Sequence, residues 1–371
     1  MKIKVRNFIF LFIFIFMLFI PTISYFFLKG YINETNTEKR TLAKKPELTF
    51  ANIAEYPKEF ESYFNDNLAY RNSIINMWRN INYSVFDESL DNRVTVGKDN
   101  NNETWLFYSN RSDGDEMSFI DGRKIYSPNE MKATSDRIKN ETEKLKNRNI
   151  ELFYIMIPNK STVYPDYLPK SVDVKQDAFT DMYKYLKKDG VNNIYYPIDL
   201  LKNESQSQET YYRTDTHWND FGAYISFDSV LKDIYNYQVF DNISIKPGFT
   251  NKFKGDLRGF MGITSELKDN DITVSYPNSD CISLDVTQTE HGPVEVYENS
   301  KYSINETLLL VGDSFSKAAI KPLTAAYKKV VRVYLNTTSY TNDFLKEYKP
   351  DKVFLIGVER YGVKNIGFLN K

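Results

Sequence analysis

Apolar and amphipathic segments alternate along most of this chain of 371 residues. Short apolar runs, typical of buried strands, occupy residues 104–108, 150–157, 193–196, 306–312, 330–335 and 352–357. Apolar side chains recur at helical spacing over residues 53–64, 70–86, 129–147, 176–188, 221–235, 317–327 and 342–348. Apolar strands that alternate with amphipathic helices build a parallel sheet covered on both faces. The pattern therefore predicts an α/β fold in which helices sandwich a parallel sheet.

The alternation stops between about residues 237 and 305. This segment is rich in Gly, Asn and Asp, and it contains β-like runs such as Ile272–Tyr276 and Val294–Tyr297. Turn-forming residues between short β-like runs are typical of hairpins. We therefore expect a β-rich insertion that lies over one rim of the sheet.

The N-terminal segment has the composition of a membrane anchor. Lys2, Lys4 and Arg6 precede an uncharged apolar run from Phe8 to Leu28. At about 1.5 Å per residue, a helix of this length crosses the roughly 30 Å hydrocarbon core of a bilayer, and its basic end is expected in the cytoplasm. A cleaved signal peptide is the alternative, although its apolar region is usually only ~7 to 15 residues long. We favour an uncleaved anchor, which makes the chain a single-pass protein of the cell membrane with its body outside the cytoplasm.

These patterns divide the chain into three parts. Residues 1–30 form the anchor, residues 31–50 form a polar tether, and residues 51–371 form the body with its insertion. Long polar segments between an anchor and a folded body are typical of linkers.

Composition and charge exclude several classes of protein. A net charge of −1 and a pI near 6.3 give no reason to expect nucleic-acid binding. The single cysteine, Cys281, excludes an internal disulfide, and with only two histidines a zinc cluster is not expected. The chain has neither a phosphate-binding loop of the Walker type nor a dinucleotide fingerprint. The sequence therefore predicts no cofactor and no metal.

One histidine lies in a motif that predicts an oriented base. His217 follows the carboxylate of Asp215 by two residues, and Trp218 comes next. In an extended segment, residues two apart point to the same side, so Asp215 can reach one imidazole nitrogen and leave the other free. The other histidine, His291, has no such carboxylate nearby and is expected in a surface loop.

A candidate nucleophile follows about a hundred residues later. The apolar run 306–312 ends in Gly312, and Ser314 lies between this strand and the next helical pattern. Backbone N–H groups at the N-terminus of a helix stabilise an oxyanion. Asp215, His217 and Ser314 therefore form a candidate catalytic triad.

Two other polar clusters follow the ends of strands. Asn159 and Lys160 come after the strand 150–157, and Arg360 comes after the strand 352–357. Because the carboxyl ends of parallel strands meet at one rim, we expect both clusters to lie beside Ser314. Asn159, Lys160 and Arg360 are thus candidates for binding the oxyanion or the substrate. Trp218, beside His217, is a further candidate for the substrate site, and we expect it to pack in the wall of the site; stacking on a sugar is the alternative.

These motifs resemble those of the SGNH-hydrolase-like proteins that include the alginate O-acetyltransferases, and most of all their Gram-positive relatives, the DHHW proteins. The resemblance rests on Asp215-Thr-His-Trp, followed by Asn-Asp-x-Gly-Ala, and on the later Gly312-Asp-Ser-Phe-Ser. Ordinary SGNH hydrolases carry the serine motif early and Asp-x-x-His late, whereas the order here is reversed and the spacing is Asp-x-His, as in the acetyltransferase branch. Thr216 stands where the family name implies His.

The resemblance implies a flavodoxin-like sandwich and transfer of acetyl groups to hydroxyls of a polysaccharide outside the cell. It also implies that a multipass membrane-bound O-acyltransferase supplies the acetyl group, because acetyl-CoA is cytoplasmic and the body is not. The same triad with water as acceptor makes an esterase, and the sequence does not separate the two. A third possibility is a non-catalytic scaffold that presents polysaccharide to a membrane complex.

Overall fold

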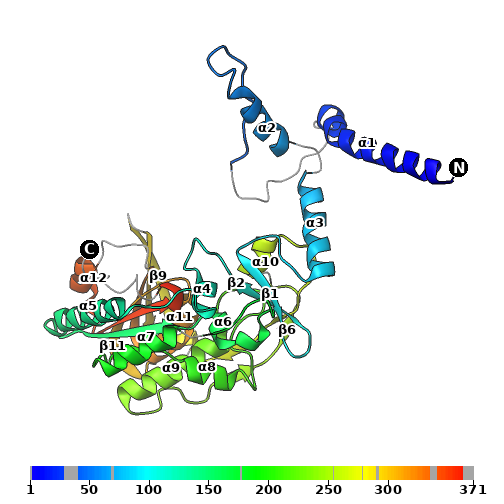
Figure 1. The fold of residues 1–371 in the computed structure, drawn as a ribbon. Coiled ribbons are helices and arrows are strands. Elements are labelled where there is room, and N and C mark those ends of the chain that lie inside the picture. Colours follow the sequence, from blue (N-terminus) through cyan, green and yellow to red (C-terminus); the bar gives the residue numbers. More distant parts are fainter. Residues whose placement is uncertain are drawn as a thin grey trace. The chain divides into compact units, whose positions relative to one another are not determined.

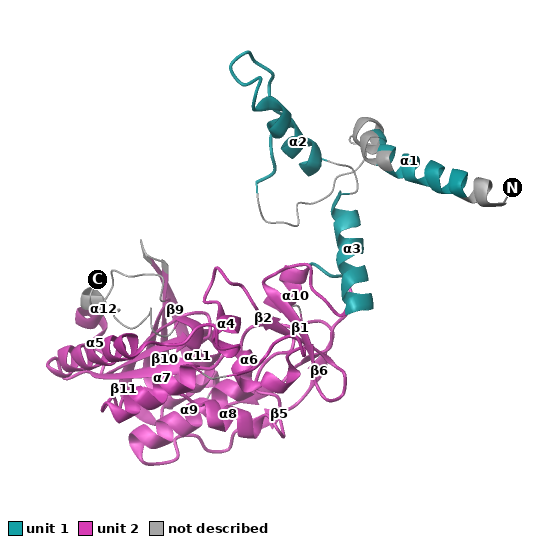
Figure 2. Ribbon diagram, in the orientation of Figure 1, with its two compact units in different colours: residues 1–86, 262–264 teal, residues 87–261, 265–371 magenta. Residues whose placement is uncertain are grey.

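The computed structural model describes residues 2–28, 41–67, 71–175, 178–253, 255–277, 279–289, 292–334 and 341–361 (Figure 1). The chain divides into two compact units (Figure 2), one made of residues 1–86 and 262–264 and the other of residues 87–261 and 265–371. Residues 31–40, the first half of the predicted tether, lie outside the described residues, as does His291.

The first unit is helical. Its helices are α1 (Lys2–Leu28), α2 (Tyr56–Asp66) and α3 (Arg71–Phe86). The chain before α2 returns to the end of that helix, where the Ala43 N–H donates to a carboxylate oxygen of Asp66 at 2.8 Å. Among the described residues, no helix combines the length and the apolar character that a membrane crossing requires. The predicted anchor is therefore not confirmed and stays a prediction.

The second unit contains all the strands of the described chain. Its helices are α4 (Glu116–Ile120), α5 (Pro128–Lys146), α6 (Lys160–Val163), α7 (Ala178–Lys188), α8 (Ile198–Glu204), α9 (Asp220–Tyr235), α10 (Asp256–Met261), α11 (Ser316–Ala326) and α12 (Thr341–Tyr348). Its strands are β1 (Val94–Lys98), β2 (Thr104–Tyr108), β3 (Glu151–Ile157), β4 (Ile194–Tyr195), β5 (Ser244–Lys246), β6 (Phe249–Thr250), β7 (Asp269–Asn270), β8 (Thr273–Ser275), β9 (Ile282–Thr289), β10 (Gly292–Asn299), β11 (Ile304–Gly312), β12 (Tyr327–Tyr334) and β13 (Lys352–Val358). The α/β alternation predicted after residue 129 is confirmed.

The main sheet has seven strands in the order β4-β3-β13-β11-β12-β10-β9. The first five run parallel, whereas β10 pairs antiparallel with both β12 and β9. The prediction of a purely parallel sheet is therefore wrong, because the sheet is mixed. The error arose from β9 and β10, which belong to the segment predicted as an insertion but extend the main sheet at its edge.

The central strands of this sheet are covered on both faces, as predicted, whereas the edge strand β9 leaves Leu284 and Val286 exposed. Side chains alternate across a strand, so Leu308 and Leu310 of β11 join one core cluster while Leu309 and Val311 join another. The first cluster includes side chains of α9 and α11, and the second includes side chains of α5, α7 and α12. Strand β11 thus runs through the centre of a helix-covered sheet, and its end at Gly312 is held from both sides.

The remainder of the predicted insertion forms two small antiparallel ladders, β5 with β8 and β6 with β7, together with the short helix α10. The second unit begins at Asp87. Within the described chain, the two core clusters contain no residue before Trp105. The predicted start of the body at residue 51 stays a prediction.

Candidate active site

The ends of three neighbouring parallel strands form the base of the site. Strands β3, β13 and β11 lie side by side and end at Ile157, Val358 and Gly312. The carboxylate of Asp313, directly after β11, accepts the N–H of Val358 at 2.7 Å and that of Phe315 at 2.9 Å. The predicted convergence of three polar clusters at one rim is therefore confirmed for the strand ends.

Glycine at position 312 allows this turn to be tight. A Cβ atom at Gly312 would lie 2.6 Å from Cβ of Ser316 and 2.9 Å from the carbonyl oxygen of Ile356. Both distances are shorter than any normal contact, so β11 and α11 approach each other only because this residue has no side chain. Ser314 lies in the turn between them.

Asp215 and His217 lie in a bent loop and not in the extended segment predicted. The loop is closed by an isolated antiparallel bridge between Tyr211 and Trp218 and by a hydrogen bond from the Tyr212 N–H to the His217 carbonyl at 3.2 Å. Asp215 Oδ1 accepts the backbone N–H of His217 at 3.0 Å, a bond between residues two apart that is typical of Asx turns. The spacing of two therefore orients the histidine through a turn.

The three predicted triad residues are brought together. His217 Nδ1 lies 2.6 Å from Asp215 Oδ1, and His217 Nε2 lies 2.8 Å from Ser314 Oγ. Burial alone raises the pKa of Asp215, but hydrogen bonds from the His217 ring and from the N–H groups of Asp256 and His217 outweigh it and hold this pKa below its ordinary value. Asp215 thus stays ionised, which fixes the His217 tautomer that carries hydrogen on Nδ1 and leaves Nε2 to accept from the serine.

Lys160 has a different position from the one predicted. It is 3% exposed, and its ammonium donates to the carbonyl oxygens of Tyr212, Arg213 and Asp215 at 2.9, 3.1 and 2.6 Å. An ammonium has three N–H donors, so none is left for an oxyanion or a substrate. The predicted direct role of Lys160 is wrong, and the residue instead holds the loop that carries Asp215.

The N–H groups of the same loop are also satisfied. The carboxylate of Asp269, which is fully buried, accepts the N–H of Arg213 at 2.7 Å and that of Thr214 at 2.8 Å. Burial raises the pKa of Asp269, and these hydrogen bonds and the charge of Lys160 oppose the increase. A cation therefore binds the carbonyls of the loop and a carboxylate binds its N–H groups, which fixes an irregular backbone that no regular ladder supports.

A second carboxylate beside His217 was not predicted. Asp256 Oδ2 lies 3.9 Å from His217 Nδ1, and the backbone N–H of Asp256 donates to Asp215 Oδ2 at 2.9 Å. Its side chain also accepts from the N–H of Thr216 at 2.8 Å and from the Thr216 hydroxyl. The preceding residue must be glycine, because a Cβ at Gly255 would lie 2.2 Å from the carbonyl oxygen of Thr214. The pair Gly255-Asp256 is the only local sign of this contact in the sequence. The loop that it approaches lies about forty residues earlier in the chain, so the contact becomes visible only in the fold.

Asn159 and Arg360 contact each other at the rim. Arg360 Nη1 donates to Asn159 Oδ1 at 2.6 Å and to Glu116 Oε2 at 3.3 Å. Asn159 is fully buried, and both its backbone N–H and its side-chain amide donate to Glu359 Oε1, at 2.9 and 2.8 Å. Asn159 therefore orients Arg360, whereas Arg360 itself lines a cleft together with Ser314.

Ser314 lies between two clefts. One, which we call the apolar cleft, has a volume of about 570 Å³ and is lined by Tyr212, Phe253, Phe315, Ala318 and Lys317, among others. The other, which we call the polar cleft, has a volume of about 440 Å³, and its lining includes Tyr108, Asp113, Asp256, Tyr334 and Arg360. Ser314 and His217 line both, so two different ligands can reach the same hydroxyl.

Trp218, a candidate either for the wall of the site or for stacking on a sugar, packs into the wall. Its indole is fully buried, and Nε1 donates to the carbonyl oxygen of Phe315 at 3.0 Å. This bond joins the residue after His217 to the residue after Ser314.

The backbone N–H groups beside the serine differ in their availability. The N–H of Ser314 has no acceptor among the described residues, whereas the N–H of Phe315 donates to Asp313. The Ser314 N–H and the Arg360 guanidinium are therefore the candidate oxyanion donors.

Asp215, His217 and Asp256 also have the composition of a metal site, since one ligand atom of each lies within 4.8 Å of the others. The Asp215 and His217 atoms are already joined by the 2.6 Å hydrogen bond. A cation would have to break this bond, so the arrangement fits acyl transfer better than metal binding.

Comparison with known proteins gives consistent results. Residues 94–323 match the family described as "SGNH hydrolase-like domain, acetyltransferase AlgX". The chain is 23% identical over 211 residues to a protein of Pseudomonas aeruginosa named probable alginate O-acetylase AlgJ. The aligned region covers 54% of this chain and 49% of that protein. A second AlgJ, from Pseudomonas fluorescens, is 23% identical over 216 residues. The chain therefore spans about half the length of the curated relatives it matches.

Two solved structures share the fold. Bacillus cereus PatB1 superposes with a TM-score of 0.53 at 14% identity, over 72% of this chain and 97% of PatB1. A DHHW family protein from Eubacterium siraeum superposes with a TM-score of 0.52 at 15% identity, over 76% of this chain and 98% of that protein. At these identities the likeness establishes the α/β fold alone.

Burial of Lys160 predicts a specific dependence of stability on pH. Burial lowers the pKa of this ammonium from 10.5 to about 8, although Asp269 and Asp215 oppose the decrease. Between these two values the unfolded chain binds more protons at this site than the folded chain, so the contribution of Lys160 to the free energy of unfolding rises with pH, by up to about 3 kcal/mol over the interval. We expect the free energies of unfolding of wild type and Lys160→Met, measured by denaturant titration, to diverge above about pH 8. Parallel curves from pH 7 to 10 contradict the assignment.

The second carboxylate predicts an effect of Asp256→Asn on the base. The amide retains the shape of the side chain but removes the negative charge 3.9 Å from His217 Nδ1. We expect kcat for hydrolysis of an acyl ester to fall about tenfold, because the imidazolium that forms during the reaction loses a stabilising negative charge. Asp136→Asn, which removes an exposed carboxylate of α5 paired with Lys132 and outside both clefts, is the matched control. Equal rates for the two variants would show that Asp256 has no electrostatic role.

Proposed function

This chain belongs to the SGNH hydrolase-like family of the acetyltransferase AlgX, and we propose that it is an O-acetyltransferase that carries an acetyl group on Ser314 to a hydroxyl of a polysaccharide. The observation that carries the proposal is the His217 ring, which lies 2.6 Å from Asp215 and 2.8 Å from Ser314. The names of its relatives, alginate O-acetylases, support acetyl transfer to a polysaccharide.

The first half of the proposed reaction loads the serine. Ser314 Oγ attacks the carbonyl carbon of the acetyl donor, and its proton passes to His217 Nε2. The oxygen that becomes negative accepts from the Ser314 N–H and from Arg360, the donors that the site leaves available. When the intermediate collapses, His217 returns the proton to the leaving group, and the acetyl ester of Ser314 remains.

The second half transfers the acetyl group. A hydroxyl of the acceptor loses its proton to His217 Nε2 and attacks the acetyl-serine, after which the proton returns to Ser314 Oγ. We place the acceptor in the polar cleft, since Asp113, Asp256, Tyr334 and Arg360 supply the hydrogen-bonding groups that sugar hydroxyls need. The apolar cleft then receives the acetyl donor.

Hydrolysis is the second candidate function. The His217 side chain is 27% exposed, so water can approach the base. With water in place of a sugar hydroxyl, the same steps make the protein a carbohydrate esterase. A non-catalytic scaffold is a weaker candidate, because a scaffold has no need for an imidazole held between a carboxylate and a hydroxyl.

Replacement of the nucleophile tests the proposal. We expect wild type to release the chromogenic leaving group of an acetyl ester and Ser314→Ala to reduce this rate by at least about 10³-fold, because the covalent route is lost. Asp136→Asn, an exposed substitution on α5 outside both clefts, controls for a general loss of folding. With an oligosaccharide present, acetylated sugar detected by mass spectrometry selects transferase over esterase. Equal inactivity of wild type and Ser314→Ala, with no acyl adduct on Ser314, refutes both enzymatic functions.

We further propose that the body lies outside the cytoplasm, anchored by its N-terminal segment, and receives its acetyl group from a membrane-bound O-acyltransferase. The basic residues before the apolar run support this orientation. Cys281, the one cysteine, supplies a test. We expect a membrane-impermeant maleimide to label wild type in intact cells but not Cys281→Ser, and labelling that requires lysis would place the body in the cytoplasm.

A further inference from the structure

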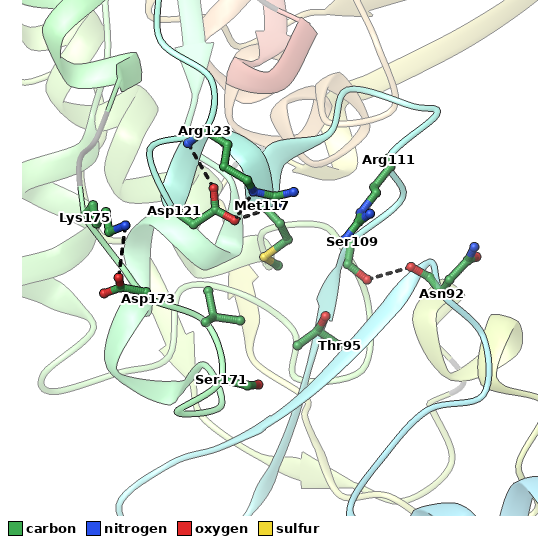
Figure 3. Close-up of a pocket in the computed structure, with 11 residues that line it drawn as sticks. Asn92, Thr95, Ser109, Arg111, Met117, Asp121, Arg123, Ser171, Asp173 and Lys175 are labelled. Carbon is green, nitrogen blue, oxygen red and sulfur yellow. Dashed lines mark hydrogen bonds and ion pairs between the residues drawn. The ribbon is translucent and has the colours of Figure 1, made fainter.

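A third cleft, which we call the distal cleft, lies beside the polar cleft. It has a volume of about 670 Å³ and is enclosed by two walls (Figure 3). Asn92, Ser109 and Arg111 form one wall, and Asp121, Arg123 and Lys175 lie on the other. Sites for small molecules and cofactors in proteins commonly have volumes of about 300 to 1,000 Å³.

One short loop lines both clefts. Tyr108 and Asp113 line the polar cleft at Ser314, whereas Ser109 and Arg111 line the distal cleft. The loop is held at its polar-cleft side by the Tyr108 hydroxyl, which donates to Asp113 Oδ2 at 2.6 Å. The polar cleft and the distal cleft therefore border the same loop, residues 108–113.

Hydrogen bonds fix both walls before any ligand binds. On one side, the N–H of Ser109 donates to the carbonyl oxygen of Arg93 at 2.8 Å, and the Ser109 hydroxyl donates to the carbonyl oxygen of Asn92 at 3.0 Å. On the other, the N–H of Lys175 donates to the carbonyl oxygen of Ile120 at 3.0 Å. A cleft with fixed walls loses little conformational entropy when a ligand enters.

The lining has the chemistry of a site for hydroxyl groups. Arg123 donates through Nε to Asp121 Oδ2 at 2.7 Å, and Lys175 pairs with Asp173 at 3.2 Å, so two of the three cations are already neutralised (Figure 3). Arg111 is exposed and has no ion pair within the part of the chain that the structure describes. Together, the two ion pairs and the neutral amide and hydroxyl side chains of the lining offer hydrogen-bond donors and acceptors in similar number. This mixture suits a polyhydroxyl chain, whereas a phosphate calls for concentrated cations and a lipid for apolar walls.

We propose that the distal cleft is a subsite for the non-reacting sugar units of the acceptor polymer. The proposal rests on the proposed function, since it takes the acceptor to be a polysaccharide that enters through the polar cleft. Contacts in the distal cleft hold the chain while one hydroxyl lies at Ser314. Binding energy from remote units then increases the rate at which long acceptors react, and it leaves the reaction of the donor unchanged.

Acceptor length provides the test. Alginate, cellulose and chitin oligosaccharides, each from disaccharide to octasaccharide, are offered to the full chain with a chromogenic acetyl ester. We expect kcat/KM for transfer by wild type to rise with length for at least one series. Arg111→Ala and Lys175→Ala are expected to lower transfer to the octasaccharide about five- to tenfold and to leave both transfer to the disaccharide and hydrolysis of the ester unchanged. Lys188→Ala, which removes an exposed cation of α7 outside the three clefts, is the matched control.

The outcomes separate the two proposals. Hydrolysis that depends on Ser314, combined with transfer that does not depend on length in any of the three series, overturns the distal subsite and leaves the enzymatic proposal intact. Equal losses with disaccharide and octasaccharide in the Arg111 and Lys175 variants also overturn it. If wild type shows no turnover, the enzymatic proposal fails, and binding of the same oligosaccharides to Ser314→Ala decides the subsite. Tighter binding of the octasaccharide that is lost in Arg111→Ala supports it, and equal affinities refute it.

Discussion

The buried ammonium of Lys160 is the contact on which the site depends. The loop of residues 211–218 belongs to neither a helix nor the main sheet, and backbone N–H groups reach only some of its carbonyls, among them that of Arg213, which accepts from Leu106 at 2.9 Å. Lys160 binds three carbonyls, including those of Tyr212 and Asp215, and Asp269 binds two of the N–H groups between. A buried backbone group without a partner costs about 1–3 kcal/mol. Charged side chains from β7 and α6 therefore supply partners that a regular ladder would otherwise provide, and they hold the loop that presents Asp215 and His217.

The sheet fixes Ser314, the candidate nucleophile, by a separate mechanism. Gly312 ends a strand that is covered on both faces, and Asp313 joins it to the end of β13 through the Val358 N–H. Burial raises the pKa of Asp313, so its hydrogen bonds to backbone N–H groups are what keep the carboxylate compatible with the interior. The two halves of the triad are then joined at a second point, because Trp218 donates to the carbonyl oxygen of Phe315. Base and nucleophile thus keep their distance even though they lie on independent supports.

The sequence predicted what is repeated or local and missed what depends on long-range contacts. Period and alternation identified the strands and helices after residue 129, and the spacing of Asp215 and His217 identified the oriented base, although a turn and not a strand produces it. The edge strands β9 and β10 were assigned to an insertion, because short antiparallel strands with turns between them have the same pattern wherever they pair. Lys160 was expected at the reacting atoms, since neither its burial nor its carbonyl partners can be predicted from the residues around it. Asp256 approaches His217 only because Gly255 lets two distant segments touch.

The exposed face of His217 decides what kind of acyl transfer this geometry favours. The ring is accessible enough for water to reach it, so burial would not protect the acetyl-serine of the proposed reaction. In that reaction transfer would compete with hydrolysis, and the outcome would depend on how long an acceptor hydroxyl stays beside Ser314 relative to water. A fixed wall that binds sugar units far from the reacting atoms, as proposed for the distal cleft, would lengthen that time without making the triad less accessible. An accessible triad with such a subsite is therefore consistent with transfer to a polymer, whereas the same triad without it would favour hydrolysis.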